Sequence, residues 1–198
     1  GVLPLLENYF TVHLIDLPGF GDSPPLPEHS LAAMAQAVLV QAPPEAVWVG
    51  WSLGGLVAMQ AALIAPDRVR RLVTVASNPQ FAQDADWPGI QPTVLTQFIS
   101  SLSGDFKTTI ERFLAIQAMG SESARQDIKA LKTWLAEKPL PHPSALSDGL
   151  QILQQDDLRP QLADLAMPYL AMFGKLDRLV PIEVAQRVSL LAPDAEIY

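Results

Sequence analysis

The chain has 198 residues, of which 49% are hydrophobic and 17% charged, a composition typical of a folded globular protein rather than a disordered one. The 13 basic and 21 acidic residues give a net charge of −8, which argues against a nucleic-acid-binding protein. The lack of cysteine excludes disulfides and thiolate sites, and no apolar run reaches the roughly 18 residues that cross a bilayer.

Strand-like and helix-like segments alternate in the first part of the chain, which predicts an α/β fold with a mostly parallel sheet and helices on both faces. Ser30 is expected to cap the first long helix, and Pro66 is expected to end the second. The predicted elements, in chain order, are a strand at 10–15, a turn at 16–23, a helix at 30–40, a strand at 46–49, a helix at 53–65 and a strand at 71–76.

The alternation stops between residues 86 and 157, where the pattern is helical throughout. A block of helices inserted into an α/β alternation predicts a lid over the sheet. The predicted organisation is therefore a core formed by 1–85 and 158–198, with a helical lid at 86–157. The expected elements of these later parts are helices at 93–102, 106–119, 123–137 and 144–155, a strand at 168–173, a helix at 180–191 and a strand that starts at 195.

The segment Gly50-Trp51-Ser52-Leu53-Gly54 carries the strongest chemical signal, because it matches G-x-S-x-G between a predicted strand and a predicted helix. This is the setting of a nucleophile elbow, a strained turn in which Gly50 and Gly54 are expected to give the backbone room. Ser52 is then an exposed nucleophile, and the Leu53 N–H is predicted to stabilise an oxyanion. The alternative is a glycine-rich turn with an ordinary surface serine.

A serine nucleophile needs a base and an acid that orients the base, and in this setting the acid follows the serine along the chain. Asp177 lies just after the predicted strand at 168–173, at the end where open α/β sheets place functional groups. We predict that Asp177 is this acid; the alternative is a helix-capping or solvated carboxylate. Asp156 and Asp157 are competitors, but they end a predicted helix.

The histidines do not supply an obvious base. His13 lies inside the first predicted strand, and His29 and His142 lie in proline-rich loops, so we expect all three to be structural or solvent-facing. The chain begins without an initiator methionine and stops inside a predicted strand. We therefore expect a piece of a longer protein, truncated at both ends, with the catalytic histidine beyond Tyr198 and no activity of the piece alone.

Several stretches together resemble the pimeloyl-[acyl-carrier protein] methyl ester esterase family, carboxylesterases of the α/β-hydrolase superfamily that act in biotin synthesis. The resemblance extends over nearly the whole chain, whereas G-x-S-x-G by itself marks only the superfamily. The stretches that carry it are HLIDLPGFGDS (13–23), VGWSLGGLVA (49–58), LVTVASNP (72–79), DWPGI (86–90), ERFLAIQAMG (111–120), ARQD (124–127) and GKLDRLVP (174–181).

The resemblance implies a role for each residue of the motif. Ser52 is the nucleophile, Asp177 the triad acid and Leu53 one oxyanion donor, and neither a metal nor an organic cofactor is needed. A second oxyanion donor is expected in an H-G-W-G loop upstream of the sequence given. Trp51 and Phe113 are expected to line the acyl site, with packing under the elbow or within the lid as the alternative.

The charge of the predicted lid differs from that of the remaining chain. Residues 105–138 hold six basic and five acidic side chains, although the whole chain is strongly acidic. Arg125 and Lys129 fall on one helix face, which suits an acidic partner or an ordinary solvated surface. By the resemblance, the partner is acyl carrier protein bearing a pimeloyl methyl ester, bound by Arg112, Arg125 and Lys129.

The expected function is therefore hydrolysis of a carboxylic ester by a cytoplasmic, monomeric serine esterase with a Ser-Asp-His triad. Two alternatives stay open: a general short-chain carboxylesterase or C–C bond hydrolase on the same fold, and a catalytically inactive ligand-binding module. No membrane or nucleic-acid partner is expected.

Overall fold

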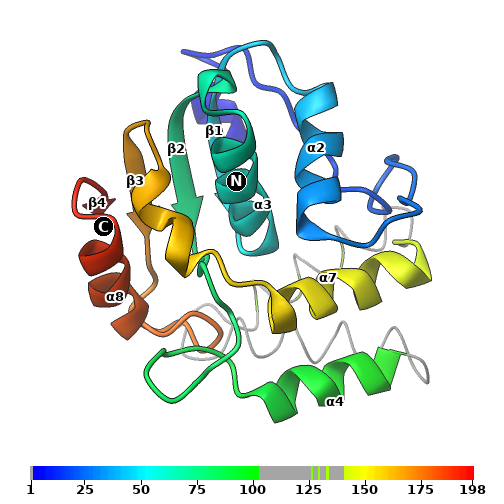
Figure 1. Ribbon diagram of the computed structural model, residues 1–198. Helices are drawn as coiled ribbons and strands as arrows, with labels where there is room; N and C mark the ends of the chain where they lie inside the picture. The colour runs from blue at the N-terminus through cyan, green and yellow to red at the C-terminus, as the bar shows by residue number, and fades with distance from the viewer. Residues whose placement is uncertain (1, 103–125, 127–128, 130–132, 134–140) are drawn as a thin grey trace.

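The computed structural model describes residues 2–102, 126, 129, 133 and 141–198. Helices and strands alternate along this part of the chain, and two helices, α4 and α7, stand between the second and third strands (Figure 1). The elements are α1 (Leu3–Leu6), α2 (Leu31–Gln41), β1 (Ala46–Trp51), α3 (Leu53–Ile64), η1 (Pro66–Arg68), β2 (Val69–Val75), α4 (Pro92–Leu102), α7 (Pro143–Gln155), η2 (Arg159–Asp164), β3 (Tyr169–Met172), α8 (Glu183–Leu191) and β4 (Glu196–Ile197).

The four strands run parallel in one sheet, and their order, β1-β2-β3-β4, follows the chain. Parallel neighbours need a crossover connection, which α3 supplies between β1 and β2 and α8 supplies between β3 and β4. Trp51 pairs with Val75, and Val75 pairs with Met172. The carboxyl ends of β1, β2 and β3 are therefore level, and the residues that follow them share one edge of the sheet.

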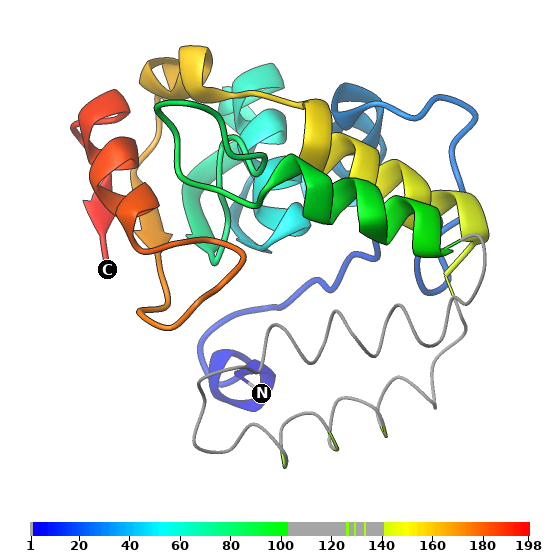
Figure 2. The same cartoon turned by 90° about the horizontal axis from the view of Figure 1, so that it is seen from below.

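The hydrophobic core lies between the sheet and α2, α3 and α8, which Figure 2 shows on one side of the strands. α3 is apolar over most of its surface because it packs against both the sheet and α2; its residues 56, 57 and 59 are at most 1% exposed. Alternate residues of β1 point to the other face. There Val47, Val49 and Trp51 are 44%, 63% and 59% exposed.

Most helix predictions are confirmed with small shifts of their ends. Ser30 caps α2 as predicted, because its Oγ accepts the N–H of Ala33 at 3.1 Å. The helices predicted at 93–102 and 144–155 are α4 and α7, each beginning one residue earlier. The helices predicted at 106–119 and 123–137 fall on residues that the structure does not describe, apart from 126, 129 and 133.

The strand predicted at 10–15 is wrong. Residues 11–17 have no regular secondary structure, and Phe10 and Leu14 are 60% and 77% exposed. The residue types favour a strand, but a strand forms by pairing with another strand. Among the described residues, the sheet ends at β1 and this segment does not pair with it.

α4 and α7 lie side by side beyond the carboxyl ends of the strands, where β2 points in Figure 1. Gln154 of α7 donates its side-chain N–H to Thr96 Oγ1 of α4 at 3.0 Å. These two helices belong to the segment 86–157, for which a lid is predicted, and they lie next to the edge of the sheet at which β1 ends.

Candidate active site

Ser52 occupies a sharp turn between β1 and α3, with φ 52° and ψ −121°. A non-glycine residue with positive φ is uncommon, and such a backbone costs about 1–3 kcal/mol, so the surrounding structure must hold it. The neighbouring strand does so, because the Ser52 N–H donates to the carbonyl of Val75 at 3.0 Å. The strained turn predicted from the motif is therefore present, and β2 supports it.

Gly50 is the position where this turn needs a residue without a side chain. A Cβ at Gly50 would overlap the carbonyl group of Gly54, in the first turn of α3. The expectation that Gly54 has the same need is wrong, because a Cβ at Gly54 would have no described neighbour within 4 Å. Of the two glycines in the motif, Gly50 is the one that the close approach of β1 to α3 requires.

We expect Gly50→Ala to lower the free energy of unfolding by about 3 kcal/mol, because the added methyl group forces β1 away from α3. Gly54→Ala is the matched control. It is expected to be neutral or stabilising, since alanine favours a helix over glycine by roughly 1 kcal/mol. Urea unfolding of both variants measures the difference, and equal destabilisation of the two would contradict the close contact assigned to Gly50.

Leu53 is the first residue of α3, so its N–H has no acceptor within the helix. The dipole of α3 also favours negative charge at this end. The Ser52 Oγ makes no hydrogen bond with any residue that the structure describes. An unengaged hydroxyl therefore lies beside a donor suited to an oxyanion, which is the arrangement that acyl transfer to serine requires.

Asp177 lies in the loop between β3 and α8, at the same edge of the sheet as Ser52. Its Oδ1 accepts the N–H groups of Leu179 and Val180 at 2.8 and 3.0 Å, which fix the carboxylate. Its Oδ2 makes no hydrogen bond with the described residues and can accept one from an imidazole. One strand separates β1 from β3, which corresponds to about 10 Å between them and leaves room for that imidazole.

The competing acids are less suitable. Asp157 binds Arg159 through both carboxylate oxygens, each at 2.9 Å. Burial raises the pKa of Asp156, which favours its neutral form over the carboxylate that would orient a base. Among these three acids, Asp177 is the one fixed at a strand end with an oxygen available.

All three histidines are described, and none of them contacts the elbow through a hydrogen bond. The Nδ1 of His29 lies 2.6 Å from Oδ2 of Asp148 in α7. The Nδ1 of His142 lies 2.8 Å from Oγ of Ser144, at the beginning of α7. His13 is exposed in the extended segment that follows α1. These positions agree with the expectation that the three histidines are structural or solvent-facing.

α7 contacts the core at several points near the elbow. The N–H of His142 donates to the carbonyl of Gly19 at 2.8 Å. The pair of His29 with Asp148 links α7 to the loop before α2. Farther along the helix, a Cβ at Gly149 would lie 3.1 Å from Cδ2 of Leu53. α7 therefore lies against the beginning of α3, next to the turn that holds the serine.

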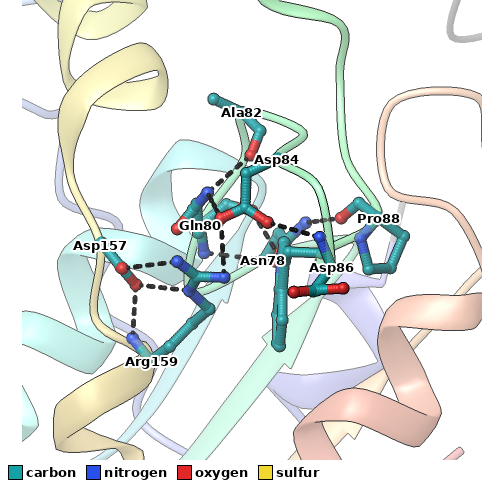
Figure 3. Close-up of polar contacts among 9 residues, drawn as sticks. Asn78, Gln80, Ala82, Asp84, Asp86, Pro88, Asp157 and Arg159 are labelled. Atoms are coloured by element: carbon teal, nitrogen blue, oxygen red, sulfur yellow. Dashed lines mark hydrogen bonds and ion pairs between the residues drawn. The ribbon is translucent and has the colours of Figure 1, made fainter.

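A polar cluster ties the far end of α7 to the loop after β2 (Figure 3). Arg159 pairs with Asp84 of that loop at 3.0 Å and with Asp157 at 2.9 Å, and its guanidinium lies 5.1 Å from the ring centre of Trp87. Trp87 Nε1 in turn donates to the buried Asn78 at 3.0 Å. The sequence pattern did not predict this cluster, although the stretch DWPGI (86–90) supplies its tryptophan.

The structure places the other predicted binding residues as follows. Trp51 is 59% exposed at the end of β1, so it does not pack under the elbow. Lys129 is exposed. Arg112, Phe113 and Arg125 lie outside the described residues.

The residues that the structure describes form neither a metal-binding cluster nor a membrane-spanning helix. No three His, Asp or Glu side chains in these residues lie close enough together to hold a metal ion. No helix among them is long and apolar enough to cross a membrane.

The fold has well-matched counterparts among solved structures. A hydrolase from Oleispira antarctica superposes with a TM-score of 0.84 at 22% identity, over 100% of this chain and 75% of its own. An esterase from Exiguobacterium antarcticum superposes with a TM-score of 0.78 at 20% identity, over 92% of this chain and 70% of its own. At these identities the likeness shows the fold alone.

Sequence comparisons place the chain more narrowly. The model of the alpha/beta hydrolase fold family matches residues 1–196. The pimeloyl-[acyl-carrier protein] methyl ester esterase of Photobacterium profundum is 54% identical over 98% of this chain and 76% of its own length, and that of Vibrio vulnificus is 53% identical over 100% and 77%. With more than half of its residues shared over nearly its whole length, the chain belongs to the pimeloyl-[acyl-carrier protein] methyl ester esterase family of α/β hydrolases.

Proposed function

We propose that the protein hydrolyses the methyl ester of a pimeloyl group carried by acyl carrier protein, the reaction for which its relatives are named. The proposal rests on the geometry of Ser52. This residue has a positive φ at the beginning of α3, and its hydroxyl makes no hydrogen bond with the described residues. A general esterase or C–C bond hydrolase would use the same serine, so the substrate needs a test of its own.

In the proposed reaction, Ser52 Oγ attacks the ester carbonyl carbon while a histidine takes its proton. Asp177 orients that histidine through its available Oδ2. The Leu53 N–H and a second donor stabilise the oxyanion of the tetrahedral intermediate. The histidine then protonates the leaving methoxide, methanol departs, and water hydrolyses the acyl-enzyme to give the free carboxylate and restore Ser52.

We assign the histidine and the second oxyanion donor to parts of the protein outside residues 1–198. Two facts support this assignment. The chain spans about three quarters of the length of the relatives, and none of its three histidines makes a hydrogen bond with Ser52. The proposal requires neither a metal nor an organic cofactor, and it includes the monomeric state and cytoplasmic location expected from the sequence.

The lid at 86–157 is proposed to form the acyl site with the carboxyl edge of the sheet. α4 and α7 support this, because α7 lies against Leu53 and is tied to the core at both of its ends. Trp51 and Phe113 are proposed to contact the acyl chain. Arg112, Arg125 and Lys129 are proposed to bind the acidic carrier protein.

The proposal is tested on the full-length protein with two kinds of substrate. The carrier-linked methyl ester is expected to be hydrolysed with a kcat/KM about tenfold or more above that of p-nitrophenyl esters. The reverse preference would favour a general esterase. A fluorophosphonate should label Ser52, as located by peptide mapping, and a protein that is not labelled and hydrolyses neither ester would be an inactive binding module.

Lys129→Glu tests the carrier-binding surface. The variant is expected to raise the KM for the carrier-linked ester about fivefold at low salt, because a repulsive charge replaces an attractive one in the encounter with an acidic partner. The KM for p-nitrophenyl acetate should not change. Arg70→Glu, at another exposed basic position, is the matched control, and an equal effect of both variants would contradict a specific role for Lys129.

A further inference from the structure

Ser77, two residues after β2, places its hydroxyl against the backbone of the nucleophile. Its side chain is 3% exposed, and its Oγ donates to the carbonyl of Ser52 at 2.9 Å. The same carbonyl accepts the N–H groups of Gly55 and Leu56 at 2.9 and 3.2 Å. Gly55 and Leu56 belong to α3. Among the described residues, Ser77 is therefore the donor that links this carbonyl to the segment after β2.

The backbone around Ser77 is built to hold it there. Ala76 has φ 46°, and its N–H donates to the carbonyl of Met172 at 2.9 Å, so the chain turns sharply while it remains attached to the sheet. A positive φ at alanine costs about 1–3 kcal/mol and persists only where neighbours enforce it. On the α3 side, a Cβ at Gly55 would overlap the Ser77 side chain, so the glycine provides the space that Ser77 fills.

The carbonyl that Ser77 binds is chemically connected to the proposed oxyanion donor. The Ser52 carbonyl and the Leu53 N–H belong to one planar peptide unit, so fixing the direction of one fixes the direction of the other. A hydrogen bond to the carbonyl also polarises the peptide and strengthens its N–H as a donor. The geometry therefore connects Ser77 to the point where negative charge develops in ester hydrolysis.

We infer that Ser77 is a positioning residue for the hydrolysis: its hydroxyl holds the Ser52–Leu53 peptide so that the Leu53 N–H points at the oxyanion. The inference rests on the proposed function, and it assigns to Ser77 no contact with the substrate. It requires that loss of the hydroxyl weaken binding of the transition state more than binding of the substrate.

Ser77→Ala in the full-length protein tests this. We expect kcat to fall about tenfold and KM to stay within about twofold, since the substrate carbonyl depends on the donor less than the oxyanion does. The affinity for a boronic acid that forms a tetrahedral adduct with Ser52 should fall by a similar factor. Ser77→Cys keeps a weaker donor at the same place, and its kcat should lie between those of Ser77→Ala and the wild type.

Thr74→Val is the matched control, because it removes another buried hydroxyl three residues earlier in the chain, within β2. Thr74 is 1% exposed, and its Oγ1 lies 3.0 Å from the hydroxyl of Tyr169, where burial raises the pKa of Tyr169 to about 12. Among the described residues, the two hydroxyls of this pair make no hydrogen bond with the turn at Ser52. Thr74→Val should lower Tm about as much as Ser77→Ala and leave kcat and boronic acid affinity unchanged.

The outcomes separate the inference from the proposed function. The inference would be overturned, and the proposed function left intact, if Ser77→Ala kept the kcat and the boronic acid affinity of the wild type while Ser52→Ala was inactive. Equal losses of kcat in Ser77→Ala and Thr74→Val would also overturn it, because they would reveal a general effect of stability. A wild-type protein without esterase activity would overturn both.

Discussion

Ser52→Ala in the full-length protein is expected to lower kcat by about 10⁶-fold, because the acyl-enzyme can no longer form. The fold should be retained, since the hydroxyl makes no hydrogen bond with the described residues and alanine meets the same backbone strain as serine at φ 52°. Hydrolysis of a p-nitrophenyl ester measures the loss, and circular dichroism with a thermal scan checks the fold.

Ser189→Ala is the matched control for this change, because Ser189 is an exposed serine on α8 that donates to Gln186 within the same helix. It should retain full activity and fluorophosphonate labelling, whereas Ser52→Ala should lose both. A folded Ser52→Ala protein that keeps more than about one hundredth of the wild-type kcat would show that the nucleophile is another residue.

Asp177→Asn is expected to lower kcat by about 10⁴-fold with little change in KM. The asparagine carbonyl can keep the two hydrogen bonds from Leu179 and Val180, so the loop should stay in place. Its amide nitrogen, however, presents donors where Oδ2 would accept an imidazole N–H, so the base loses its orientation and the stabilisation of its charged form.

Asp156→Asn separates this role from a general effect of losing a carboxylate near the sheet edge. Burial raises the pKa of Asp156, so its charged form gains no stabilisation from its surroundings, and the amide of asparagine fills the same space. This variant should keep its kcat within about twofold of wild type. If Asp156→Asn were the slow variant and Asp177→Asn the fast one, the triad acid would have been assigned to the wrong residue.

The local sequence was sufficient to predict those parts of the site that are formed by a few consecutive residues. The motif of the elbow lies within five consecutive residues, and the cap of α2 involves Ser30 and Ala33, so both patterns appear directly in the sequence. The position of Asp177 at this edge could be predicted, because residues that follow parallel strands lie at the same edge of the sheet.

The remaining parts depend on contacts that no local pattern contains. The segment 10–15 has strand-forming residues, but its conformation depends on whether another strand lies beside it. The contact of Ser77 with Ser52 depends on the register between β1 and β2, and the pair of His29 with Asp148 depends on where α7 meets the core. Even Gly54 was misjudged, because a motif does not say which of its glycines meets the opposite backbone.

The two halves of this site are held in different ways. The reactive turn is attached to the sheet through hydrogen bonds with Val75 and Ser77. α7 is held instead by polar contacts with Gly19 and His29 and by Ile152 and Leu153, which are buried in the hydrophobic core. The hydrogen bonds that join the serine turn to the sheet come from Val75 and Ser77 and not from α7, so exposed positions of α4 and α7 are the ones to redesign when the acyl group is to be changed. Under the proposed function, evolution of these covering helices would change the acyl groups that the scaffold accepts while its nucleophile stays in place.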